Sequence, residues 1–319
     1  MLPMVKKKQY AFTFFFTCLI LFFGSRKVFA NKAIPLLPAN SSFLDQIDLE
    51  NYPSLPSPEH PPLLRWNFSG EKVYPYDFMQ KVIVTSEMDG IFVGKTEQSN
   101  SQIMKGKGKL SLKSEEHSIA RCVLEDLTIR MEINLPDCDE PEITQMQAPP
   151  MVIEGIKEDG SMEIGNSSQE LLFKTLFPIP PIPMEIGNSV TVPVQMPFNA
   201  MGSLLHVIGS SEIKLVDYVQ IDGKTCAKLE TEIDLSTLNV PVEMKGDYQC
   251  QVKGRSIFYF NIENRHFMSG KVALLMRIRV VAPTPKMNFP PGKNENAIPE
   301  TIKMAMDSDN FLSVEYIGN

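Results

Sequence analysis

Four cysteines are the first residues whose type and spacing suggest chemistry. They stand at Cys122, Cys138, Cys226 and Cys250, and a fifth, Cys18, lies in an apolar N-terminal segment. An even number of cysteines in an exported chain is typical of disulfides, and four cysteines allow three pairings. The pairing Cys122–Cys138 with Cys226–Cys250 is the simplest, and a bridge between Cys122 and Cys226 stays open as an alternative.

The four histidines do not indicate a catalytic base. His60 lies in a proline-rich segment, His117 in a polar turn, His206 in a strand-like stretch and His266 at a hairpin. Nucleophilic catalysis needs a nucleophile held beside a base, and no G-x-S-x-G elbow or similar context accompanies these residues. We therefore expect surface or turn histidines and no catalytic residues.

Neither a metal site nor a cofactor site is expected. The run PDCDEPE gathers Asp137, Asp139 and Glu140, but the spaced ligands and the glycine of an EF-hand loop are absent. The 18 methionines could supply thioether ligands for copper, yet only Met304 and Met306 stand close together. An acidic solvated loop and methionines that fill the core explain these residues better.

The aromatic residues near the start of the mature chain are the candidate ligand-binding residues. Trp66, Phe68, Tyr74, Tyr76 and Phe78 follow one another on alternating positions. Curved antiparallel sheets can close around an apolar ligand instead of filling completely, so these rings could line such a cavity. The alternative is an ordinary sandwich core, in which the same rings pack against one another.

The elements that must position these residues are β-strands. Apolar and polar residues alternate over 127–135 and 272–280, as in strands with one wet and one dry face. Asp-Gly pairs at 89–90, 159–160 and 222–223 are strong hairpin signals. No long segment has helical spacing, so the sequence predicts an all-β, antiparallel chain with little helix.

The strands are organised as two tandem repeats. We expect a Pro-rich tether over 31–61, a first β repeat over 62–178, a second over 179–283 and a linker and C-terminal tail over 284–319. The two repeats would form curved sheets or a sandwich. Whether they make one domain or two is left open.

The alignment behind this repeat carries two further expectations. It superposes Cys122 on Cys226, which is why one disulfide in each repeat is the favoured pairing. It also superposes SSQELLFKTLFP (167–178) on GKVALLMRIRVVAP (270–283), so both stretches are expected to be return strands.

The N-terminus has the pattern of a secretory signal peptide. Three lysines precede a run of about twelve apolar residues, and small residues precede a cleavage site after Ala30. Residues 1–30 carry five basic residues and no acid, so cleavage takes the net charge from −7 to −12. A mature chain this acidic is a poor ligand for nucleic acid, and no later stretch is apolar enough to span a membrane.

Several segments resemble a family of secreted bacterial β-rich proteins with tandem repeats and no characterised function. They are LLRWNFSGEKVYPY, FPIPPIPMEIGNSV, IDGKTCAKLETEI and GRSIFYFNIENRHFMSGK. The resemblance implies an exported β-rich repeat protein, and it transfers no catalytic residues. The signal peptide predicts that the mature chain is periplasmic or secreted.

Three functions are compatible with these observations. The first is non-catalytic binding of a hydrophobic small molecule or lipid in the cell envelope. The second is a structural or protein-interaction module that meets another envelope protein. The third and weakest is a hydrolase whose site has no recognisable motif.

Overall fold

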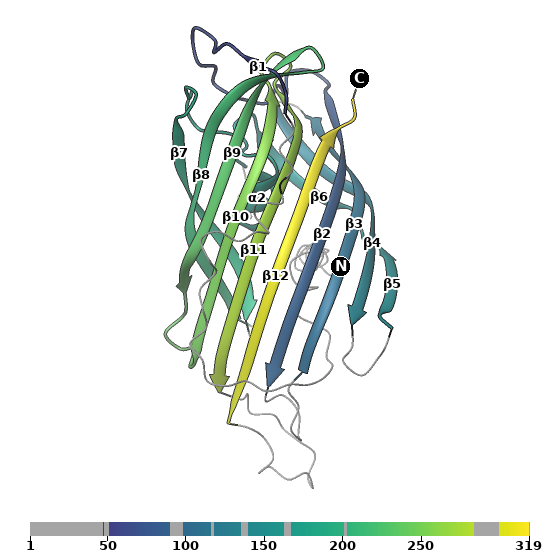
Figure 1. Ribbon diagram of the computed structural model, residues 1–319, viewed down its shortest axis with the longest axis vertical. Coiled ribbons are helices and arrows are strands. Elements are labelled where there is room, and N and C mark those ends of the chain that lie inside the picture. The colour runs from purple at the N-terminus through teal and green to yellow at the C-terminus, as the bar shows by residue number, and fades with distance from the viewer. Residues whose placement is uncertain are drawn as a thin grey trace, which may run out of the picture.

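In a computed structural model, the described residues form one large antiparallel β-sheet and one short helix (Figure 1). It describes residues 47, 51–89, 98–115, 118–134, 140–162, 167–200, 203–283 and 300–318. The elements are β1 (Ser54–Leu55), β2 (Val73–Asp89), β3 (Gln98–Ser114), β4 (Ile119–Asn134), β5 (Glu142–Gln147), β6 (Met151–Lys157), α2 (Ser167–Leu176), β7 (Ser189–Ala200), β8 (Ser203–Ile221), β9 (Lys224–Asn239), β10 (Asp247–Asn261), β11 (His266–Pro283) and β12 (Thr301–Tyr316). The mostly β, antiparallel prediction is confirmed.

The twelve strands form a single open sheet. Their order is β1-β8-β9-β10-β11-β12-β2-β3-β4-β5, with β7 paired to β8 and β6 paired to β4. The first predicted repeat contributes β2 to β6 and the second β7 to β11. The duplication itself stays a prediction.

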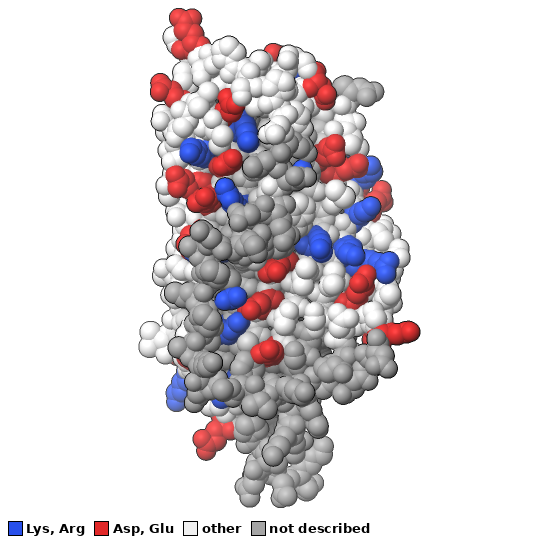
Figure 2. All heavy atoms as spheres, viewed as in Figure 1, with Lys and Arg blue, Asp and Glu red and all other residues white. Residues whose placement is uncertain are grey.

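Alternation along each strand divides the sheet into two faces. On β10, Val252, Phe258 and Phe260 belong to clusters on one face, while Ile257 and Tyr259 belong to a cluster on the other. We call the first face, which α2 covers, the inner face. The opposite, outer face carries charged residues of both signs (Figure 2).

The sheet curves around α2. Leu172, Phe173 and Leu176 of the helix join one core cluster with residues of β10, β11 and β12. The same helix lies against β7, five strands away from β12 in the sheet order. Five strand spacings span about 24 Å in a flat sheet, whereas a helix is about 10–12 Å wide. Both neighbours can reach one helix because the sheet bends.

The predicted pairing Cys226–Cys250 is wrong. Both residues carry buried free thiols, as does Cys122, and Cys138 lies outside the described residues. In the ladder between β9 and β10, Cys226 lies opposite Asn261, eleven residues from Cys250. That separation is about 37 Å along a strand, whereas a disulfide requires Cα atoms about 4.4–6.8 Å apart.

The alternative bridge between Cys122 and Cys226 is also absent from the structure. Cys122 belongs to the aromatic cluster on the inner face, and Cys226 belongs to the cluster on the outer face. The sheet therefore lies between the two sulfur atoms. The face of the sheet on which each cysteine lies decides whether the two can be bridged, and a sequence alignment of the repeats does not show that face.

Three segments differ from their expected structure. Residues 167–176 form α2 instead of a return strand. Residues 301–316, expected as a tail, form β12 in the middle of the sheet, between β11 and β2. In the expected tether, Ser54 and Leu55 pair with β8, and Tyr52 packs edge-on against Tyr259 at 5.1 Å.

Among the described residues, no helix is both long and apolar enough to cross a membrane.

Candidate functional site

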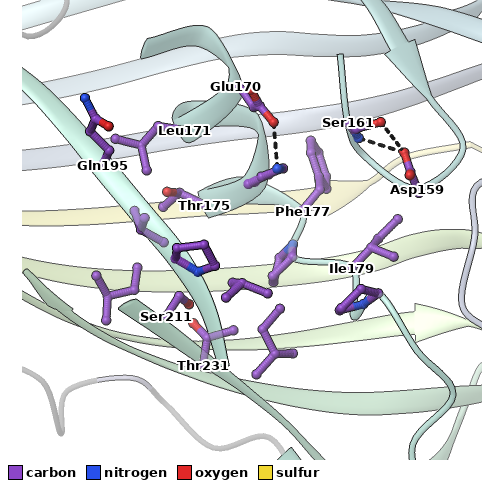
Figure 3. Close-up of a pocket in the computed structure, with 18 of the residues that line it drawn as sticks. Asp159, Ser161, Glu170, Leu171, Thr175, Phe177, Ile179, Gln195, Ser211 and Thr231 are labelled. Carbon is purple, nitrogen blue, oxygen red and sulfur yellow. Dashed lines mark hydrogen bonds and ion pairs between the residues drawn. The ribbon is translucent and has the colours of Figure 1, made fainter. Parts of the chain in front are cut away.

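A cavity of about 440 Å³ lies between α2 and the inner face of β7, β8 and β9 (Figure 3). Figure 3 shows Thr175 and Phe177 on the helix side of this space, and Ser211 and Thr231 on the sheet side. Most of its wall is apolar, contributed by Leu171, Ile179, Val192, Val194, Ile213 and Ile233.

The sheet side of the cavity follows from strand register. Ile213 of β8 lies opposite both Val190 of β7 and Thr231 of β9. Because side chains two residues apart share a face, Ser211 and Ile233 point the same way as this row. Two hydroxyl groups therefore stand in an otherwise aliphatic floor.

The hydroxyl groups are deeply buried. Thr231 is 3% exposed and Ser211 8% exposed. The hydroxyl of Thr231 hydrogen-bonds to that of Ser256, on β10, which is 2% exposed. Either oxygen can donate in this bond, and when Ser256 donates, the hydroxyl hydrogen of Thr231 can turn toward a ligand in the cavity.

The helix side of the cavity carries one ion pair. Lys174 Nζ lies 2.6 Å from Glu170 Oε1, one helical turn away on α2. A pair of this i, i+4 spacing stabilises a helix by a few tenths of a kcal/mol. Its larger consequence here is that neither charge faces the cavity uncompensated.

Arg65 fixes the proline segment that follows α2. Its Nη1 donates to the carbonyl of Pro180 at 3.0 Å and to that of Leu64 at 2.6 Å, and its Nη2 donates to the carbonyl of Pro181 at 3.0 Å. Because proline has no backbone N–H, Pro180 and Pro181 can form backbone hydrogen bonds only through their carbonyls, and Arg65 supplies the donors. This clamp holds the cavity wall that contains Ile179.

Asp159 is the remaining charged group of the lining. It accepts hydrogen bonds from the backbone nitrogen of Ser161 at 2.9 Å and from its hydroxyl at 2.6 Å (Figure 3). Partial burial acts to raise the pKa of Asp159, but these hydrogen bonds and the positive charge of Arg65 outweigh it and lower the pKa. Asp159 is therefore an ionised carboxylate whose Oδ1 already accepts two hydrogen bonds.

The five predicted ligand-binding residues lie together in a packed aromatic cluster. Their exposed fractions are 0% for Trp66, 1% for Phe68, 5% for Tyr74, 0% for Tyr76 and 2% for Phe78. None of the five lines the cavity of Figure 3. Their part in binding a ligand stays a prediction, whereas their mutual packing is what the alternative interpretation expected.

Trp66 stands at the centre of this cluster. Its ring centroid lies 5.7 Å from Phe68, 5.6 Å from Tyr74, and 5.4 Å from both Phe177 and Phe267. Phe177 also lines the cavity. The ring of Phe177 therefore belongs both to the cluster and to the cavity wall.

The two tyrosines of the cluster act as neutral hydrogen-bond donors. Tyr76 donates to the carbonyl of Phe267 at 3.0 Å, and Tyr74 donates to that of Asn67 at 2.5 Å. Burial raises the pKa of Tyr74 to about 12 and raises that of Tyr76 as well. Both phenols keep their protons, and the bond of Tyr76 joins β2 to β11, which lie far apart in the sequence.

The cavity residues Ser211 and Thr231 were not predicted from the sequence. A usable signal exists in β9, where Thr231 falls in phase with the apolar positions Leu229, Ile233 and Leu235. A hydroxyl at an inward position of an alternating strand marks a polar group that must find a partner inside.

His266 does not lie at the surface, so that prediction is wrong. It is 2% exposed, and the centroid of its ring lies 4.3 Å from that of Tyr316, with the two ring planes tilted by 39°. The hairpin turn exposes Glu263 and Asn264, but His266 already belongs to β11. His60 is exposed, as expected, and His117 lies outside the described residues.

The described part of the chain contains no group of three or more His, Cys, Asp or Glu residues placed to hold a metal ion. Asp137 and Asp139 of the acidic run lie outside the described residues, and Glu140 is exposed.

No protein-family model matches the chain, and no curated protein sequence matches it. Among solved structures, the chain is similar to lipovitellin, from a study of its lipid–protein interactions, with 8% identity and a TM-score of 0.38. That match covers 79% of this chain but 26% of the lipovitellin chain, so this chain spans about a quarter of its length. The InvG secretin of the Salmonella type III secretion injectisome matches with 11% identity and a TM-score of 0.16 over 78% of this chain and 66% of its own. Values this low carry no argument about function, and the resemblance to secreted bacterial proteins stays a prediction.

Proposed function

We propose that this chain is an exported, non-catalytic binding protein that holds a hydrophobic small molecule or lipid chain between α2 and strands β7 to β9. The observation that supports the proposal is the cavity itself. It has a volume of about 440 Å³ and a mostly aliphatic wall, built by a curved sheet and one helix. Ligand pockets in proteins typically measure about 300–1,000 Å³ and are lined in this way.

The apolar wall accounts for the expected affinity. Each methylene group that leaves water contributes ~0.8 kcal/mol, which is about fourfold in the dissociation constant. Affinity should therefore rise steeply with chain length until the cavity is full and then level off. The chain length at which it levels off would measure the usable length of the cavity.

The test is native mass spectrometry of the mature protein purified from its own envelope fraction. We expect a discrete added mass that organic solvent removes, on a polypeptide that begins at Asn31. The variant Val194→Trp places an indole in the cavity and should lose the added mass, because Val194 lines that space. The matched control is Val242→Trp. Val242 is 98% exposed, so this variant should retain the added mass. A bare mass for the wild-type chain from this fraction would contradict the proposal.

A second function, association with another envelope protein, is favoured by one feature of the sheet. Five of the six residues of the edge strand β5 are exposed, and Ile143 is 54% exposed. An unpaired strand edge can accept a strand from a partner. A partner chemically cross-linked through β5 and lost in Ile143→Lys, with no bound small molecule in either protein, would support this function instead.

A further inference from the structure

The charged groups at the cavity already have partners within the protein. Lys174 is paired with Glu170 at 2.6 Å, and the guanidinium of Arg65 donates to three backbone carbonyls. Asp159 accepts two hydrogen bonds from Ser161. These four residues bring two positive and two negative charges, so the lining has no net charge to offer a ligand.

A ligand with a charged group would therefore lack a counterion inside this cavity. Moving a charge out of water into an apolar site is costly unless it meets an opposite charge or several hydrogen bonds. An anionic ligand could obtain a counterion only by breaking the Glu170–Lys174 pair or the Arg65 clamp, and a cationic ligand would have to compete with Ser161 and Arg65 for the Asp159 carboxylate. Breaking the ion pair leaves one charge without its partner, and breaking the clamp leaves three backbone carbonyls without their donor.

The uncharged hydrogen-bonding groups of the cavity are in a different situation. Ser211 and Thr231 lie on adjacent strands and are diagonal neighbours, because Ser211 lies opposite Ile233 and Thr231 lies opposite Ile213. Diagonal neighbours on one face are about 7–8 Å apart at their Cα atoms, which one polar group can bridge. Figure 3 shows the two side chains next to each other on the cavity floor.

The Ser211 side chain lines the cavity, although the residue is only 8% exposed. A hydroxyl offers one donor and two acceptor positions. The pair formed by Thr231 and Ser256 leaves a further donor in the same area. The floor thus presents donors and acceptors without formal charge, surrounded by aliphatic side chains.

We infer that the ligand is a neutral amphiphile, a molecule with an apolar chain and one uncharged polar group, such as an alcohol or an ester, that hydrogen-bonds to Ser211 and Thr231. This inference rests on the proposed function and specifies its ligand class. The aliphatic wall holds the chain, and the two hydroxyls hold the polar group.

The experiment compares three ligands with the same alkyl chain, namely dodecanol, dodecanoate and dodecylammonium. Each displaces the neutral fluorescent probe N-phenylnaphthylamine from the purified mature protein. We expect dodecanol to displace the probe at a concentration at least about tenfold lower than either ion, since each ion lacks a counterion. Equal or tighter binding of either ion would overturn the inference, while probe binding would still support the proposed function.

Variants at the two hydroxyl positions complete the test. The double variant Ser211→Ala with Thr231→Val should weaken dodecanol binding by about fivefold or more, the usual effect of losing a neutral hydrogen bond. Probe affinity should stay within about twofold, which also shows that the variant folds. The control Thr231→Ser keeps the hydroxyl and should bind dodecanol as the wild type does. Unchanged dodecanol binding in the double variant would overturn the inference. A wild-type protein that does not bind the probe at all would overturn the proposed function itself.

Discussion

Phe177 connects the aromatic cluster to the cavity, so its truncation should affect stability and binding together. The side chain is 0% exposed, and its ring lies 5.2 Å from Phe173, 5.4 Å from Trp66 and Tyr76, and 5.5 Å from Phe267. Truncating a fully buried phenylalanine costs about 3–5 kcal/mol, since transfer energy and packing are both lost. We expect Phe177→Ala to lose free energy of unfolding in this range.

The chain contains its own reporter for this measurement. Trp66 is its single tryptophan, and its ring contacts Phe177 directly. Urea unfolding followed by tryptophan fluorescence therefore reports on the altered cluster. The loss of stability should appear as a lower urea concentration at the midpoint of unfolding. The dependence of the free energy of unfolding on urea concentration should be unchanged, because a local truncation hardly changes the total surface exposed on unfolding.

The matched control for Phe177→Ala is Ile182→Ala, in the same connecting segment but 54% exposed. Substitutions at exposed positions usually change stability by less than about 0.5 kcal/mol. A loss below about 1 kcal/mol in Phe177→Ala, or equal losses in both variants, would refute the conclusion that this ring joins the core to the cavity wall.

Two further predictions follow from buried titratable groups. Burial raises the pKa of the thiols of Cys122, Cys226 and Cys250 to about 12, so iodoacetamide near neutral pH should label them only after unfolding. Peptide mass spectrometry checks this, and rapid native labelling or an oxidised Cys226–Cys250 pair would contradict it. The pKa of His266 is lowered from 6.5, first by burial and also by Lys224 and Lys72, although a hydrogen bond to the carbonyl of Phe267 opposes the shift. Below about pH 6.5 the unfolded chain therefore binds more protons than the folded one, and stability should fall as the pH drops from there toward the lower folded pKa. His266→Gln should lessen that fall in urea titrations, and an equal slope in both proteins would count against a buried neutral imidazole.

The helix α2 shows how a pairwise comparison within a sequence can mislead. Residues 167–178 were aligned with a strand, although Ser167 and Glu170 have the S-x-x-E spacing of a helix start. Leu172, Phe173 and Leu176 also recur at helical spacing and form its buried side. These residues indicate a helix, whereas the alignment of the two repeats predicts a strand for the same segment.

Strand β12 was missed for a different reason. Its inward positions include Ser308 and Asn310, which interrupt the apolar alternation between Met306 and Leu312. Asn310 donates to the hydroxyl of Ser308 at 2.9 Å, so two polar side chains satisfy each other on the inner face. Partners of this kind are visible only after folding.

The sequence by itself determined the class of this protein, because hydrophobic burial acts on local periodicity. Alternation over 127–135 and 272–280 predicts antiparallel strands from local residues alone. Tertiary structure decided which strands became neighbours, and with them every feature of the candidate site. The cavity exists because the sheet curves around α2, and Ser211 and Thr231 meet there because of the register between β8 and β9. Register and curvature depend on contacts between residues far apart in the chain, and no single segment encodes them.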